Sequence, residues 1–270
     1  MKYKKEPYPD GGHYVNVTDF SNPIIIEKIN SFEDLFFIKS IKDVCDFNKV
    51  KDVELVIPCM FQQQHDRRFK EYQSHELQIV ADFINSCNFS KVHVFHPHSD
   101  ITGALINNFR EIDNSFFIKQ VLADLPTKPT ILSTDAGSYK WINKLADVLE
   151  FDGEVYGASK ARTSYVENGV MAHRLTQVLD RQDFEGKDIL VIDDLCVKGG
   201  TFIGLAQMLK ERNAGKLFLA ISHITVQEPN ILLGDYYDKI YATNSKYDLY
   251  NLPNLHLVSL FDHLNEKFNN

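Results

Sequence analysis

The segment Asp188–Thr201 most strongly constrains how this chain folds. Its apolar run Ile189–Ile192 is typical of a strand that is buried on both faces of a sheet. The acidic pair Asp193–Asp194 follows, and the glycine-rich turn Gly199–Thr201 then leads into residues 202–212, which have helical apolar spacing. This order suits a sugar phosphate, because glycine N–H groups and a helix N-terminus attract phosphate while carboxylates accept hydrogen bonds from ribose hydroxyls.

Strand-like and helix-like segments alternate along the rest of the chain. The predicted strands are residues 23–27, 53–58, 92–95, 130–133, 153–156, 188–192 and 216–223. The predicted helices are residues 31–45, 74–86, 137–149, 202–212 and 257–268, and residues 105–109 and 118–122 are helical or mixed. Ser31 is expected to cap the first helix in a capping box with Asp34. The alternation predicts an α/β protein with mainly parallel sheets flanked by helices.

The Pro-Thr-Lys-Pro stretch at residues 126–129 suggests a boundary between two domains of similar size. We expect an N-terminal domain at residues 1–125 and a C-terminal domain at residues 126–270, with the last helix packing back on the N-terminal domain. In such folds the chemistry lies beyond the carboxyl ends of the strands.

Composition excludes several classes of function. None of the apolar runs approaches the roughly 20 residues that span a bilayer, and the N-terminus lacks the core of a signal peptide. The four cysteines are scattered without framework spacing, which favours reduced thiols and a cytoplasmic protein. A net charge of −8 argues against broad electrostatic binding of nucleic acid.

Polar clusters follow several predicted strands. Asp66, Arg67 and Arg68 lie in the loop after residues 53–58, where an arginine fork suits phosphate, although a solvated surface loop is an alternative. His96-Pro-His98-Ser-Asp100 would contact a metal or nucleotide phosphates, or form a solvated turn.

Two further clusters are equally open on their residues alone. Asp135 precedes a helix opened by Gly137, so its carboxylate would either hold Mg²⁺ or cap that helix. Lys160 and Arg162 are spaced to project together from an extended segment, as phosphate ligands or as a surface pair.

In this order the segments resemble the ribose-phosphate diphosphokinase (PRPP synthetase) family. Six stretches carry the resemblance. In the N-terminal half, Tyr8–Gly12 is similar to the family's Phe-x-Asp-Gly-Glu motif, Ile57–Pro58 with Asp66–Arg68 is similar to its nucleotide loop, and His96–Ser99 is similar to its Asp-Leu-His-Ala segment. In the C-terminal half, Ser133–Gly137 is similar to its Ser-Pro-Asp-Ala-Gly segment, Lys160 with Arg162 to the Lys-x-Arg of its flexible loop, and Asp193, Asp194, Gly200 and Thr201 to its Asp-Asp-…-Gly-Thr motif.

The resemblance implies two phosphoribosyltransferase-like domains and transfer of the β,γ-diphosphoryl group of MgATP to the anomeric hydroxyl of ribose 5-phosphate. It implies Mg²⁺ as cofactor, ATP as co-substrate and a homo-oligomer. The implied roles are ATP binding for Asp66, Arg67, Arg68 and His98, metal binding for His98 and Asp135, catalysis for Lys160 and Arg162, and binding of the ribose phosphate for Asp193, Asp194, Lys198, Gly199, Gly200 and Thr201.

The chain departs from the family pattern at three places: Gln64-His65 in the nucleotide loop, His96, and Val197-Lys198 in the 5-phosphate loop. The last departure raises a second candidate acceptor, a 5′-substituted ribose such as ADP-ribose, with the same chemistry. The motifs also leave open a phosphoribosyltransferase that consumes PRPP and a catalytically silent regulatory subunit.

Overall fold

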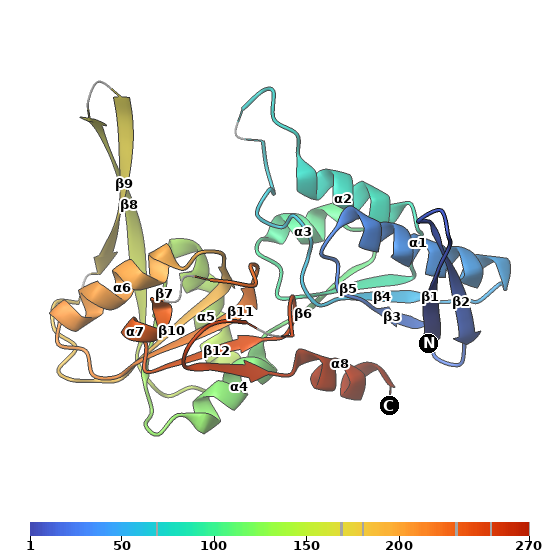
Figure 1. Ribbon diagram of the computed structural model, residues 1–270. Helices are drawn as coiled ribbons and strands as arrows, with labels where there is room; N and C mark the ends of the chain where they lie inside the picture. Colours follow the sequence, from blue (N-terminus) through green and yellow to red (C-terminus); the bar gives the residue numbers. More distant parts are fainter. Residues whose placement is uncertain (69, 168–169, 180, 230–231, 249, 270) are drawn as a thin grey trace. The chain divides into compact units, whose positions relative to one another are not determined.

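A computed structural model describes the chain except residues 69, 168–169, 180, 230–231, 249 and 270, and except the side chains at 160–178 and 269 (Figure 1). The chain forms two compact units, Met1–Asn114 with Leu260–Asn270, and Ser115–Ser259. Helix α4 (Ser115–Asp124) belongs to the second unit because Phe117 and Ile118 are buried in one of that unit's cores, so the border lies earlier than residue 125. No described helix is long and apolar enough to cross a membrane.

The first unit is built on a four-stranded parallel sheet. Its strands, in spatial order, are β3 (Ile24–Ile26), β4 (Glu54–Ile57), β5 (Lys91–Phe95) and β6 (Phe109–Ile112). Its helices are α1 (Phe32–Phe47), α2 (Glu76–Asn85), α3 (Asp100–Leu105) and α8 (Leu260–Asn269). The capping box predicted for α1 is present: Ser31 Oγ accepts from the N–H of Asp34 at 3.3 Å, and Asp34 Oδ2 accepts from the N–H of Ser31 at 2.9 Å.

The N-terminal hairpin of β1 (Lys2–Pro7) and β2 (His13–Asp19) was not predicted. Three of its first six residues are lysines, a composition that is not typical of strands. Helix α8 belongs to this unit, where Asn22 Nδ2 donates to the backbone oxygen of Phe268 at 2.9 Å.

The second unit contains a seven-stranded sheet in which six strands are parallel and the edge strand β9 is antiparallel. Its strands, in spatial order, are β13 (Leu255–Val258), β12 (Lys239–Thr243), β11 (Leu217–Ile224), β10 (Ile189–Cys196), β7 (Thr130–Ser133), β8 (Val155–Glu167) and β9 (Val170–Leu179). Helices α6 (Gly200–Glu211) and α7 (Leu233–Tyr236) contribute to one core, and α4 and α5 (Ala136–Val148) contribute to the other. The sheet is therefore covered on both faces, as the alternation predicted.

Three predicted elements differ from the structure. Residues 257–268 form the end of β13 followed by α8 rather than one helix, and residues 105–109 join the end of α3 to the start of β6. The strand predicted at 153–156 is the beginning of β8, which pairs with β9 in a long hairpin that extends beyond the rest of the sheet (Figure 1).

Candidate active site

The acidic pair Asp193–Asp194 lies inside β10, because this strand continues to Cys196 instead of ending at residue 192. Each aspartate is only 8% exposed. Both oxygens of Asp193 accept hydrogen bonds from the protein: Oδ2 from Thr134 Oγ1 at 2.6 Å, and Oδ1 from the N–H of Asp194 at 3.0 Å. Asp193 is thus held in one orientation near the carboxyl end of the sheet.

Because this pair is buried, the pKa of Asp193 differs from that of an aspartate on the surface. Burial raises the pKa of Asp193 well above its usual value, the neighbouring Asp194 raises it further, and the bond from Thr134 opposes both effects. Such a pair is poised to accept hydrogen bonds from hydroxyl groups or to hold a proton.

The glycine turn after β10 opens helix α6. Gly199 is the N-cap, with φ of +82° in the left-handed region that favours glycine. A Cβ atom at this position would lie 2.6 Å from Leu233 Cδ1, so glycine is required sterically as well. The backbone oxygen of Gly199 accepts from the N–H groups of Phe202 and Ile203 at 3.0 and 3.1 Å.

The N–H groups of Gly200 and Thr201, in the first turn of α6, have no acceptor within the helix and are available to an anion. Lys198 is exposed beside them. The turn is therefore suited to a phosphate group.

The loop after β7 caps α5. Asp135 Oδ1 accepts from the N–H of Ser138 at 2.9 Å, in a capping box that Ser138 Oγ completes. The capping role that the sequence left open is therefore real. It does not prevent metal binding, since one carboxylate can both cap a helix and ligate Mg²⁺.

Mg²⁺ prefers oxygen ligands and usually binds to only one or two carboxylates of a protein, while oxygens of the substrate phosphates complete its coordination shell. The carboxylates of Asp135, Asp193 and Asp194 fit that donor chemistry. Among the described residues, no three His, Cys, Asp or Glu side chains come together as a ready-made metal cage. The residues present thus fit a metal that arrives with a phosphate ligand.

In the first unit, the loop after β4 and the loop after β5 are joined by side-chain hydrogen bonds. Asp66 is 5% exposed and accepts from Arg67 Nε at 2.9 Å and from Ser99 Oγ at 2.9 Å. Gln63 Oε1 accepts from the N–H of His98 at 3.1 Å. The structure therefore brings Asp66 and Arg67 close to the segment that carries His98 and Ser99.

The charged and titratable side chains of this cluster lie in different environments. The bonds from Arg67 and Ser99 lower the pKa of Asp66, although burial opposes them. Arg68 and His98 are exposed, whereas His96 is buried and has φ of +39°. The exposed guanidinium and imidazole are accessible to an anionic ligand.

Comparison with known proteins places this geometry in a family. Residues 98–243, more than half of the chain, match the phosphoribosyl transferase domain. The chain belongs to this family. Ribose-phosphate pyrophosphokinases are similar to the chain along most of its length.

Two relatives illustrate the match. The chain is 24% identical to the ribose-phosphate pyrophosphokinase of Pyrococcus furiosus, covering 88% of this chain and 84% of the relative. It is 22% identical to that of Methanobrevibacter smithii, covering 80% and 75%. The crystal structure of phosphoribosylpyrophosphate synthetase from Mycobacterium smegmatis superposes with a TM-score of 0.78 at 16% identity, covering 99% of this chain and 89% of that one, and so shows the same fold.

Two predicted site residues of this phosphoribosyl transferase family chain fall where side chains are not described. Lys160 and Arg162 lie on β8, where their backbones pair with Gln177 and Leu175 of β9. Their side chains lie outside the described part of the structure.

The sequence did not single out several polar residues near the site. Thr134 donates a hydrogen bond to Asp193, and Ser99 donates one to Asp66. Each donor lies shortly after a strand end, which is the signal that could have identified it. Buried polar residues also gather at the carboxyl ends of β11 and β12: Ser222, His223, Thr243, Ser245 and Lys246. Within this group, His223 Nδ1 and Ser245 Oγ are hydrogen-bonded at 2.8 Å.

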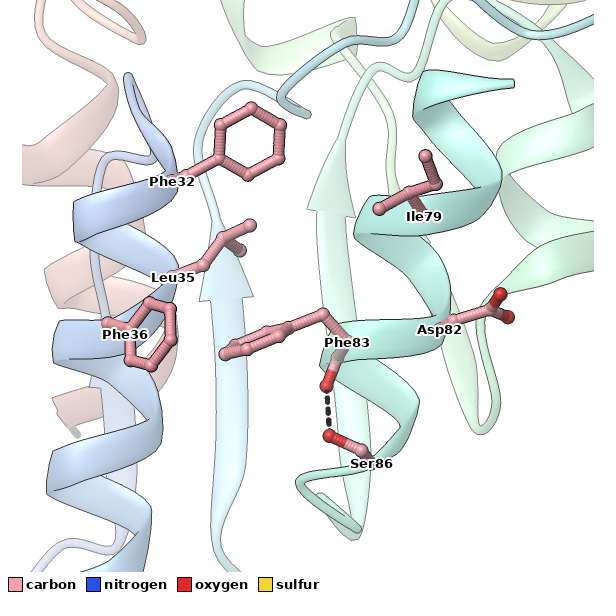
Figure 2. Close-up of a pocket in the computed structure, with 7 residues that line it drawn as sticks. All are labelled: Phe32, Leu35, Phe36, Ile79, Asp82, Phe83 and Ser86. Atoms are coloured by element: carbon pink, nitrogen blue, oxygen red, sulfur yellow. Dashed lines mark hydrogen bonds between the residues drawn. The ribbon is translucent and has the colours of Figure 1, made fainter. Parts of the chain in front are cut away.

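A surface pocket lies between α1 and α2 in the first unit (Figure 2). Apolar side chains dominate its lining, and Phe36 and Phe83 pack at a ring-centroid distance of 5.6 Å. None of the residues implicated in ATP or ribose binding lines this pocket. Its chemistry does not suit a charged substrate.

Proposed function

We propose that the protein is a diphosphokinase that transfers the β,γ-diphosphoryl group of MgATP to the anomeric hydroxyl of ribose 5-phosphate, giving PRPP and AMP. The observation that best supports this proposal is the buried pair Asp193–Asp194 just before the glycine turn at the start of α6. The ribose-phosphate pyrophosphokinases that match along the chain support the same reaction.

The acceptor would bind to the second unit. Asp193 and Asp194 would accept hydrogen bonds from the ribose hydroxyls and orient the attacking oxygen. The N–H groups of the turn Gly199–Thr201 would hold the 5-phosphate, and the exposed Lys198 would add attraction for its charge.

ATP would bind to the first unit through Asp66, Arg67, Arg68 and His98. His98 and Asp135 are our candidates for contacts with Mg²⁺, which when bound supplies neutralisation of the phosphate charge. Lys160 and Arg162 would neutralise the charge that develops at the transferred β-phosphorus. Transfer of this kind depends on positioning and charge neutralisation more than on a strong base.

A second acceptor is favoured by a specific feature of the turn. A Cβ atom placed on Gly200 would meet no other atom within 4 Å, and Lys198 is exposed nearby. This open space and added charge suit a 5′-diphosphate ester of ribose, such as ADP-ribose, in the same reaction.

Release of AMP tests both acceptors. The protein would be incubated with MgATP and either ribose 5-phosphate or ADP-ribose, with EDTA as the metal control. Rapid AMP release with one acceptor identifies the substrate, and equal inertness toward both rejects the diphosphokinase proposal. Base exchange with PRPP in place of ATP would instead reveal a phosphoribosyltransferase.

A further inference from the structure

The β8–β9 hairpin begins and ends at its foot, which we define as residues 156–158 of β8 with Leu179 and residues 181–184. This foot is hydrogen-bonded to the C-terminal end of α6. Arg212 is the C-cap residue of α6, and its Nη1 donates to the backbone oxygens of Leu179 at 2.5 Å and Arg181 at 2.7 Å. In return, the N–H of Phe184 donates to the backbone oxygen of Arg212 at 2.8 Å. The chain that leaves β9 is therefore fixed to the end of this helix.

Arg181 connects the same foot to β8. Its guanidinium carbon lies 5.0 Å from the ring centroid of Tyr156 and 5.4 Å from that of Phe184, and its Nη1 donates to the hydroxyl of Tyr156. Its Nε donates to the backbone oxygen of Asp183 at 2.7 Å. The side chain is only 15% exposed, so this contact lies largely away from water.

The anchored foot lies close to the predicted catalytic positions. Ala158 pairs with Leu179, and both belong to the buried core that includes Phe202 and Leu205 of α6. Positions 160 and 162 lie two and four residues further along β8, in the hairpin visible in Figure 1. Any shift of the foot would therefore move their backbone.

The other end of α6 begins at the glycine turn. The helix is 12 residues long, and at 1.5 Å per residue it spans about 18 Å as one rigid element. The turn Gly199–Thr201 and the hairpin foot are thus the two ends of one helix.

We propose that Arg212 and Arg181 are positioning residues that hold the β8–β9 hairpin at the C-terminal end of α6. Through α6 they would fix positions 160 and 162 relative to the glycine turn. This inference rests on the proposed function, which assigns the roles of Lys160, Arg162 and the turn. Leu179 is 3% exposed, so its carbonyl would have few replacement donors without Arg212.

The test compares R212M with R212K and with K210M. R212M keeps most of the aliphatic stem but removes the donors. R212K restores a donor. K210M removes an exposed cation from the last turn of the same helix, where Lys210 Nζ lies over the ring of Tyr236 and has no described contact with the hairpin. Amide hydrogen exchange of residues 155–179 and steady-state kinetics of AMP release would be measured for each.

We expect R212M to speed exchange in the hairpin and to lower kcat by roughly 10- to 100-fold, with KM for the ribose acceptor changed less than about threefold. R212K should recover part of both effects, and K210M should match the unsubstituted protein. R181M should resemble R212M. Unchanged hairpin exchange in both arginine variants would overturn the anchor, and unchanged kcat with faster exchange would overturn its positioning role. An unsubstituted protein inert toward both acceptors would reject the proposed function, an outcome visible before any variant is made.

Discussion

Thr134 Oγ1 donates a hydrogen bond to Asp193 Oδ2 at 2.6 Å, and this bond joins the end of β7 to the acidic pair of β10. Both residues are buried. The bond favours the ionised carboxylate, whereas burial and Asp194 favour the protonated one. Thr134 therefore keeps Asp193 more acidic than its surroundings alone would.

Replacing Thr134 by valine should move the pKa of Asp193 further upward, because it removes the contribution that lowers it. If the ribose hydroxyls require the ionised carboxylate, the acid limb of the kcat/KM profile should shift to higher pH. KM for the acceptor at pH 7 should rise roughly tenfold, the cost of about one charge-assisted hydrogen bond. Thr134→Ser keeps the hydroxyl and should retain the original profile. An unshifted acid limb in the valine variant would remove Thr134 from this role.

Asp193→Asn should make the protein more stable at neutral pH while abolishing AMP release. The folded-state pKa of Asp193 is raised above the unfolded value of 3.8, so this group favours folding at low pH and loses that contribution as pH rises through the folded pKa. The variant should therefore gain stability at pH 7 and almost none at a pH below the unfolded-state value. Urea unfolding at both pH values measures the difference, and a gain that does not depend on pH would contradict the titration.

Gly199→Ala should destabilise the second unit and weaken acceptor binding. The new Cβ would meet Leu233 at 2.6 Å and would sit on a backbone with φ of +82°, so a loss of about 1–3 kcal/mol is expected. Gly200→Ala is the matched control for stability, because its Cβ meets no atom within 4 Å. Thermal unfolding of both variants provides the comparison. Equal melting temperatures would show that Gly199 is not sterically required.

The sequence predicted the repeating pattern of this fold because local physical signals determine it. The apolar run Ile189–Ile192 is typical of a buried strand, and the Ser31–Asp34 capping box depends on residues three positions apart. The glycine turn was also predicted, because Gly199 and Gly200 interrupt the pattern between a buried strand and a helical segment, but the left-handed conformation of Gly199 was not.

Long-range pairings account for what the sequence did not reveal. Thr134 and Asp193 are 59 positions apart, and nothing local marks one as the partner of the other. Residues 157–179 lack a sustained alternation of apolar and polar side chains, so their pairing as a hairpin was not predicted. Residues 257–268 contain apolar spacing on both sides of Ser259, which concealed the change from β13 to α8.

Lys160→Ala gives the most direct test of the proposed chemistry. Lys160 lies on β8, in the hairpin anchored by Arg181 and Arg212. If its ammonium group acts on charge that develops only during transfer, kcat should fall by roughly 10²- to 10³-fold. The dissociation constant for MgATP should then change less than about threefold, because binding in the ground state does not use that interaction.

The matched control for this variant is Ser159→Ala. Ser159 is exposed and adjacent on the same strand, so it reports any general disturbance of β8. Its kinetics should remain near those of the unsubstituted protein. Isothermal titration with a non-hydrolysable ATP analogue and the rate of AMP release separate binding from turnover. If Lys160→Ala instead binds the ATP analogue much more weakly, Lys160 already contacts the nucleotide in the ground state. The proposed role would then be wrong, because an interaction confined to the transition state lowers kcat and leaves the dissociation constant unchanged.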